Sequence, residues 1–234
     1  MMTFTNYTLP KKVYIRYFWT RFCFQKDWII YGDNNIQTGN IFQLMGFFDT
    51  EKGVEEYIKM AEGYDGTELI KILQGFLPEN STILELGMGP GKDLDILSMN
   101  YTVTGSDSSQ IFLDLYKKKN PKTDLLKIDA VTLDTNRTFD CIYSNKVLHH
   151  LTRDKFKKSI QRQAKILTPN GIVFHSFWKG DKDENYDGLL FTRYEIDGLK
   201  EIIGDIFDIL TINVYTEMEK DDSIYVVLSK PSEI

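Results

Sequence analysis

Apolar and polar residues alternate along most of the chain with the spacing of helices and strands. The first regular pattern is a helix that Asp49 or Thr50 can cap and that Gly63 ends. A second amphipathic helix follows Asp65 and stops before Pro78. Beyond it, short apolar runs take turns with amphipathic ones, which is typical of strands that alternate with helices.

Seven apolar runs have the length and composition of buried strands. They cover residues 82–86, 102–106, 125–128, 139–144, 172–177, 207–215 and 224–229. Helical spacing predicts further helices over residues 92–99, 110–119, 154–167 and 193–203. This alternation predicts an α/β fold in which a parallel sheet carries helices on both faces. The polar stretch 179–188 is expected to be a loop, and the acidic run 217–222 a solvated turn.

The amino-acid composition of the chain changes near Met45. Eleven aromatic residues fall within residues 1–44, and this segment carries five Lys or Arg against two acids. Its apolar residues follow neither the helical nor the strand period, so it is either an aromatic lid over a pocket or a non-native leader before Met45. We therefore predict an N-terminal extension, residues 1–44, and one main domain, residues 45–234.

Composition narrows the possible functions. The 42% hydrophobic and 26% charged residues resemble ordinary globular usage, and the net charge of −6 has the wrong sign for gripping nucleic acid. Two separated cysteines, Cys23 and Cys141, support neither a disulfide framework nor a thiolate metal site, and fit a reducing cytoplasm. The apolar stretch 13–24 is too short and too charged to span a membrane. We expect no metal, nucleic acid or membrane partner.

The clearest local motif is a strand that enters a glycine loop, Leu84-Glu85-Leu86-Gly87-Met88-Gly89-Pro90-Gly91-Lys92-Asp93, and then a helix. Glycine lets backbone N–H groups approach a ligand closely. A P-loop would need glycine at Leu86 and Ser or Thr at Asp93, so that interpretation fails twice. A dinucleotide loop would need a third glycine at Lys92, which weakens it without excluding it.

This loop also resembles the first motif of class I S-adenosylmethionine-dependent methyltransferases. Four further stretches resemble later motifs of that family in the correct order: 103–107, 128–130, 139–145 and 167–171. The resemblance covers about residues 48–230. It implies a doubly wound, mostly parallel seven-stranded Rossmann-like sheet with the last strand antiparallel, plus an N-terminal helical cap.

The resemblance also implies the cofactor, S-adenosylmethionine, and where it binds. Asp107 is expected to hold the ribose hydroxyls, and Asp129 to meet the adenine amino group. The cofactor-binding residues predicted in this way are Glu85, Gly87, Met88, Gly89, Asp107, Ser108, Asp129, Ala130, Ser144 and Asn145.

The function expected from the resemblance is methyl transfer to a small-molecule acceptor by a monomer or homodimer. His150 is the candidate general base, because it follows the fourth strand and an imidazole titrates near neutral pH. Tyr64, between the first two helices, is the second catalytic candidate. Packing roles remain open for both. The alternatives are a catalytically inactive protein that binds the same cofactor, or a nicotinamide-dependent dehydrogenase.

Overall fold

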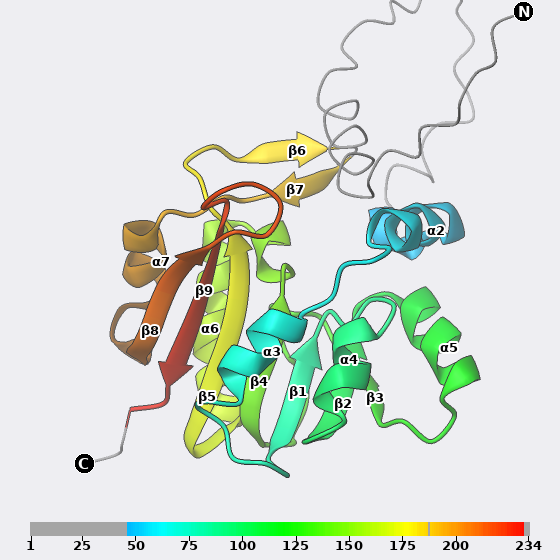
Figure 1. Ribbon diagram of the computed structural model, residues 1–234, viewed down its shortest axis with the longest axis horizontal. Helices are drawn as coiled ribbons and strands as arrows, with labels where there is room; N and C mark the ends of the chain where they lie inside the picture. Colours follow the sequence, from blue (N-terminus) through cyan, green and yellow to red (C-terminus); the bar gives the residue numbers. More distant parts are fainter. Residues whose placement is uncertain (1–45, 187, 232–234) are drawn as a thin grey trace, which may run out of the picture.

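The computed structural model describes residues 46–186 and 188–231 and builds them around one seven-stranded sheet (Figure 1). The strand order is β3-β2-β1-β4-β5-β9-β8. Pairings from β3 through β5 are parallel, and β9 runs antiparallel to both β5 and β8. The strands are β1 (Thr82–Leu86), β2 (Thr102–Asp107), β3 (Leu125–Lys127), β4 (Phe139–Asn145), β5 (Leu167–Trp178), β8 (Asp208–Tyr215) and β9 (Ser223–Ser229). The predicted sheet, with its last strand antiparallel, is confirmed.

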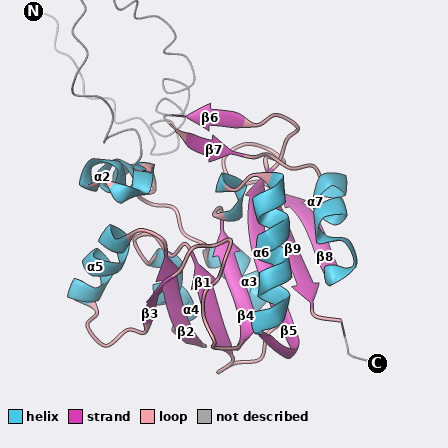
Figure 2. Ribbon diagram, turned by 180° about the vertical axis from the view of Figure 1, so that it is seen from behind, coloured by secondary structure: helices cyan, strands magenta, loops and turns pink. Residues whose placement is uncertain are grey.

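Helices cover both faces of the sheet, as the alternating pattern predicted (Figures 1 and 2). One face carries α3 (Thr67–Leu73), α4 (Lys92–Leu97) and α5 (Gln110–Lys119), and the other carries α6 (Arg153–Ile166) and α7 (Ile196–Ile203). Two large clusters of buried apolar side chains fill the spaces between sheet and helices. This rigid frame holds the carboxyl ends of β1, β2 and β4 at one edge.

The described chain begins with a short helical segment above that edge. It consists of η2 (Phe47–Asp49) and α2 (Glu51–Met60). Thr50 caps α2 by accepting a hydrogen bond from the Gly53 amide at 3.1 Å, one of the two caps that the sequence offered. The Ser109 hydroxyl donates to the Phe48 carbonyl at 2.6 Å and so ties the segment to β2's end. The predicted extension, residues 1–44, lies outside the described residues.

The sequence pattern predicted that the stretch 179–188 is a loop, but part of it forms a strand. It contains β6 (Glu184–Tyr186), which pairs antiparallel with β7 (Leu189–Phe191) in a separate hairpin. The sequence between these strands is Asp187-Gly188, a dipeptide typical of two-residue hairpin turns, and Gly188 has φ +84°. The hairpin lies above the carboxyl ends of β4 and β5, opposite α2 (Figure 1).

Two single-turn helices complete the described elements: η3 (Leu148–His150), directly after β4, and η4 (Gly204–Ile206). Within the described ranges, every helix is too short or too polar to cross a membrane.

Candidate functional site

A pocket opens at the carboxyl ends of β1 and β4, between α2 on one side and the β6–β7 hairpin on the other. Its wall is built from segments distant in sequence: α2, the α2–α3 connection, the glycine loop, the turn after β4, β7 and the β8–β9 loop. The lining residues used below are Phe48, Glu56, Tyr57, Tyr64, Asp65, Glu85, Gly87, Met88, Lys92, Asp93, Asn145, Lys146, His149, His150, Trp178, Phe191 and Glu217.

The three glycines of the loop, Gly87, Gly89 and Gly91, all have positive φ, a conformation that favours glycine. Gly87 has φ +65°, and a Cβ there would lie 2.6 Å from the Val147 side chain. Gly89 has φ +50°, and its nearest neighbour, Tyr57 Cε1, would lie 3.5 Å from a Cβ. Any side chain at Gly89 would therefore fill the space between the loop and α2. The sequence motif keeps that space open for a ligand.

Asp107, at the end of β2, supports the same loop. One carboxylate oxygen accepts from the Gly89 amide at 2.9 Å and the other from the Ser109 amide at 2.8 Å. The side chain is buried, and this burial raises its pKa although the backbone hydrogen bonds oppose the shift. Each oxygen keeps a free lone pair, so the carboxylate can also accept hydrogen bonds from ligand hydroxyls.

The side chain of Glu85 places a buried carboxyl group at the pocket, and one of its oxygens has no hydrogen-bond donor in the part of the chain that the structure describes. It is 3% exposed, and its Oε2 has no hydrogen-bond partner among the described residues. Burial, followed by the charges of Asp93 and Asp107, raises its pKa well above the usual value. A cationic ligand group at this carboxyl would supply the missing partner.

Asp93 fixes the wall beside Glu85. Its carboxylate accepts from the Gly66 backbone amide at 2.6 Å, the Tyr143 hydroxyl at 2.9 Å and the Asn145 side-chain amide at 3.1 Å. These bonds join the start of α3, strand β4 and the glycine loop's helix into one rigid corner.

Lys92, the bulky residue at the third-glycine position of a dinucleotide loop, has a structural task here. Its ammonium group donates to the carbonyls of Ala61 at 2.6 Å and Tyr64 at 3.2 Å. The lysine thus holds the α2–α3 connection, and Tyr64 with it, over the glycine loop.

His150 faces the pocket as a neutral imidazole. Its Nδ1 lies 2.7 Å from the Leu190 carbonyl, which can only accept, so Nδ1 carries the proton and Nε2 keeps its lone pair. Burial lowers the pKa to about 4, although the Leu190 hydrogen bond opposes this shift. The expectation that this imidazole titrates near neutral pH is therefore wrong, because burial penalises its charged form.

The neighbouring His149 is more deeply buried and also lines the pocket. Neither ring nitrogen has a hydrogen-bond partner among the described residues. Its ring stacks on Phe191 at 5.3 Å between centroids. Burial, and then the nearby positive charges, lower its pKa well below the usual value, so it too is neutral.

Lys146, directly after β4, is the centre of a buried polar network. Its ammonium group donates to the Phe177 carbonyl at 2.8 Å and the Ser223 hydroxyl at 2.7 Å, and pairs with Glu217 at 3.1 Å. The same group lies 3.7 Å from the centroid of the Trp178 ring. Burial lowers the lysine pKa to about 8, although Glu217 opposes the shift.

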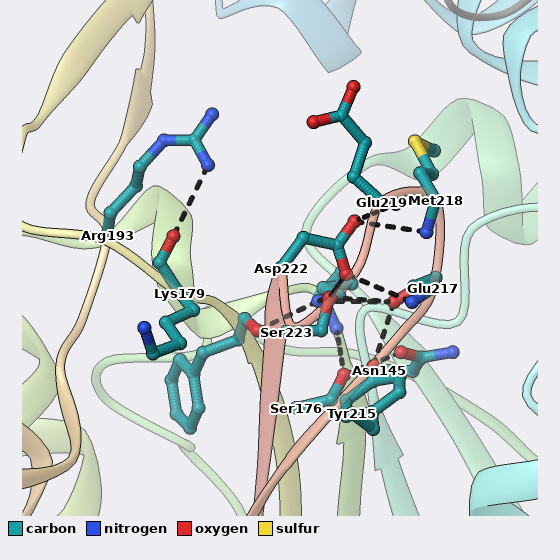
Figure 3. A network of polar contacts seen from close by, with 12 residues as sticks. Asn145, Ser176, Lys179, Arg193, Tyr215, Glu217, Met218, Glu219, Asp222 and Ser223 are labelled. Carbon is teal, nitrogen blue, oxygen red and sulfur yellow. Dashed lines mark hydrogen bonds and ion pairs between the residues drawn. The ribbon is translucent and has the colours of Figure 1, made fainter.

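The β8–β9 loop delivers Glu217 to this network (Figure 3). The Asp222 carboxylate accepts the backbone amides of Glu217, Met218 and Glu219 at 2.8 to 3.0 Å and so folds the loop back on itself. Tyr215 donates to Glu217 at 2.8 Å. The interpretation of residues 217–222 as a solvated turn is thus wrong for Glu217 and Asp222, which organise one wall of the pocket.

The comparisons with known proteins agree with this geometry. Residues 83–171, which contain the glycine loop and β4, match the family model described as "Methyltransferase domain". The chain carries a class I S-adenosylmethionine-dependent methyltransferase domain. The predicted family and enzyme class are thereby confirmed.

The curated relatives match this methyltransferase domain over part of their length. A tRNA (carboxymethyluridine(34)-5-O)-methyltransferase of Arabidopsis thaliana is 32% identical over 120 residues, which are 50% of this chain and 28% of the relative. An uncharacterized methyltransferase of Bacillus cereus is 30% identical over 116 residues, 48% of this chain and 54% of the relative. The chain therefore matches about half or less of the length of these relatives.

Solved structures share the fold of the methyltransferase domain at low identity. A S-adenosylmethionine-dependent methyltransferase from Clostridium acetobutylicum superposes with a TM-score of 0.62 at 16% identity, covering 76% of this chain and 98% of that one. The N-methyltransferase NodS from Bradyrhizobium japonicum, in complex with S-adenosyl-L-homocysteine, gives 0.62 at 14% identity, covering 79% of this chain and 100% of that one.

The structure brings most residues that the sequence suggested for the methyltransferase site to one place. The pocket wall includes Glu85, Gly87, Met88, Asn145, His150 and Tyr64. Gly89 and Asp107 are joined directly behind that wall. The site therefore combines a glycine loop, buried carboxyl groups and an imidazole.

Four predicted residues stand apart from the pocket wall. The Ser144 hydroxyl is fully buried and bonds His175 Nδ1 at 2.8 Å. Asp129 is exposed and its Oδ1 accepts from the amides of Val131 and Thr132, so it closes its own turn. Ser108 is exposed, and the Ala130 carbonyl accepts from the Ser159 hydroxyl.

Sequence reasoning missed several residues of the methyltransferase pocket. The sequence pattern singled out neither Tyr57, within the first predicted helix, nor Lys146, which directly follows Asn145. Glu217 lay inside an acidic run without a motif. Only the fold makes these residues neighbours, since 71 positions separate Lys146 from Glu217.

Proposed function

We propose that this protein transfers a methyl group from S-adenosylmethionine to a small-molecule acceptor. The observation that carries the proposal is one pocket that joins the open glycine loop and the buried acids to a neutral imidazole with a free Nε2. The cofactor, when bound, supplies an electrophilic methyl group on a sulfonium.

The residues of the chain fit this cofactor. The buried Glu85 carboxyl group lacks a partner and suits the ammonium group of the methionine part. Asp107 has free lone pairs for the two ribose hydroxyls, and the open space at Gly89 admits the sugar. We propose the full predicted set for cofactor binding, Ser108, Asp129, Ala130, Ser144 and Asn145 included.

The acceptor is held in the other half of the pocket, between the Tyr64 hydroxyl and the hairpin. Its lone pair forms the new bond to carbon, while the electrons of the carbon–sulfur bond stay on sulfur. Where the attacking atom bears a proton, His150 Nε2 can accept it. Because a low pKa makes this imidazole a weak base, positioning of the acceptor supplies the larger part of the acceleration.

Other acceptors and locations fit less well. The name of the Arabidopsis relative raises a tRNA acceptor, but the chain's net charge of −6 opposes binding of a polyanion. As the compartment we propose the reducing cytoplasm, because a sequence with only two widely separated cysteines, Cys23 and Cys141, is not typical of a disulfide framework.

Calorimetry tests the proposal directly. We expect S-adenosylhomocysteine to bind and NAD to bind more weakly. Asp107→Ala removes two hydrogen bonds to a charged acceptor and should lower S-adenosylhomocysteine affinity at least tenfold, about 1.4 kcal/mol or more. Asp114→Ala, at an exposed position of α5, is the control and should leave S-adenosylhomocysteine affinity unchanged. Tighter binding of NAD would overturn the assignment.

A further inference from the structure

The pocket wall carries more negative than positive charge. Five carboxyl groups line it, those of Glu56, Asp65, Glu85, Asp93 and Glu217, against two ammonium groups, those of Lys92 and Lys146. Both lysines already donate to protein acceptors, Lys92 to two carbonyls and Lys146 to three groups. The two histidines of the wall are neutral. Once a cationic group of the cofactor lies beside Glu85 and ionises it, the wall has three negative charges in excess.

The surroundings of the pocket mouth have the same sign. Helix α2 carries three glutamates against two lysines, and the β8–β9 loop carries four acids against Lys220 alone. By contrast α6, on the back of the sheet, carries six basic residues and a single acid, Asp154. The segments around the mouth thus carry an excess of negative charge, which attracts cations and repels anions.

Burial and the nearby carboxylates raise the pKa of two tyrosine hydroxyl groups that line the pocket. Burial raises the pKa of Tyr57 to about 12, and the charges of Asp107, Asp93 and Glu217 add to the shift. Burial and then Glu217 also raise the pKa of Tyr64. The Glu217 carboxylate therefore lies within electrostatic reach of both hydroxyl groups, although it is paired with Lys146.

The acceptor half of the pocket is also aromatic. Tyr64, Trp178 and Phe191 supply ring surfaces to this part of the wall. Aromatic faces attract ammonium groups, and the Lys146 ammonium over Trp178 shows that interaction inside this wall. Carboxylates together with aromatic faces are the surroundings that suit an organic cation.

We propose that the methyl acceptor is a small organic cation drawn in by Glu56 and Glu217, in which a charged nitrogen is bound by the carboxylates and a separate neutral atom of the same molecule keeps the lone pair that attacks the methyl group. The inference rests on the proposed function, because the cofactor's single net positive charge would leave two of the three excess negative charges for the acceptor. Glu56 is the more available carboxylate, since its one ion pair, with exposed Lys52, spans 3.9 Å.

Metabolites separated by their charge test whether the methyl acceptor is a cation. The full chain is incubated with methyl-labelled S-adenosylmethionine and with three separate probes: cationic metabolites from a cation-exchange resin, anionic metabolites from an anion-exchange resin, and total tRNA. Labelled products are resolved from the cofactor by chromatography. We expect label in the cationic fraction. Absence of label there overturns the inference, whether or not the anionic fraction or tRNA is labelled.

Charge-neutral variants then test the two carboxylates with the labelled fraction. Glu56→Gln and Glu217→Gln should each raise the KM for the cationic acceptor at least fivefold and leave S-adenosylhomocysteine affinity within twofold. Glu219→Gln, in the same loop but outside the pocket wall, should leave the KM unchanged. An unchanged KM in Glu56→Gln, which does not touch Lys146, overturns the role of the acidic mouth. If the unmodified protein does not bind S-adenosylhomocysteine, the proposed function is refuted, and not only the inference about the acceptor.

Discussion

At the scale of single residues, Glu85 links ligand binding to a proton. Burial raises the pKa of this carboxyl group well above its usual value, which favours its protonated form in the free protein. An ammonium group placed beside it would lower that pKa, so binding should release the proton. We expect the binding enthalpy of S-adenosylhomocysteine at pH 7 to differ between phosphate and Tris buffers. Glu85→Gln, which has no proton to release, should remove the difference. Equal enthalpies in the unmodified protein would contradict this assignment.

His150 makes the stability of the fold depend on pH. Its folded pKa of about 4 lies below the unfolded value near 6.5, so the unfolded chain binds the proton first as pH falls. The free energy of unfolding should therefore decrease from about pH 6.5 towards pH 4. At pH 5 this residue accounts for up to about 2 kcal/mol.

Urea unfolding at pH 7 and pH 5 measures that contribution. His150→Gln keeps a donor for the Leu190 carbonyl but cannot titrate, so it should lose less stability between the two pH values than the unmodified protein. His149 and His175 stay in both proteins, and their lowered pKa values leave a common remainder of the pH effect. Identical losses in the two proteins would show that His150 takes up its proton equally in both states.

At the scale of elements, the β6–β7 hairpin is a wall of the acceptor half and not a part of the cofactor loop. Phe191 stacks on His149, and the Leu190 carbonyl orients His150. Replacing residues 184–191 with a short Gly-Ser linker should leave S-adenosylhomocysteine affinity within threefold and reduce acceptor turnover more than tenfold. Glu184→Gln, which breaks only an exposed pair with Arg193, is the control. A comparable loss of cofactor affinity would contradict this division of the pocket.

The elements also show what the sequence could predict. Strand β1 and helix α5 begin and end at the predicted residues, because apolar runs and caps are local signals. The hairpin was missed because its two strands have only three residues each, although Asp187-Gly188 marked the turn. Lys146 and Glu217 were missed for a different reason, since their pairing depends on the crossover that brings β9 next to β5.

At the scale of the whole molecule, the frame that supports the site is formed by the main domain. The three clusters of buried apolar residues are built from Leu69 onward in the described part of the chain. Segment 46–50 anchors itself through Thr50 and Phe48. These contacts lie within the main domain that the sequence predicted to begin at residue 45.

A protein that begins at Met45 should therefore fold and bind S-adenosylhomocysteine as the full chain does. The measurements are the melting temperature, expected within a few degrees of the full chain, and calorimetry, expected to agree within twofold. Failure to fold would establish residues 1–44 as part of the core and contradict the predicted boundary. Acceptor turnover separates the two interpretations of that segment: an aromatic lid predicts its loss with folding and cofactor affinity intact, because the acceptor half would lose one cover, whereas a leader predicts no change.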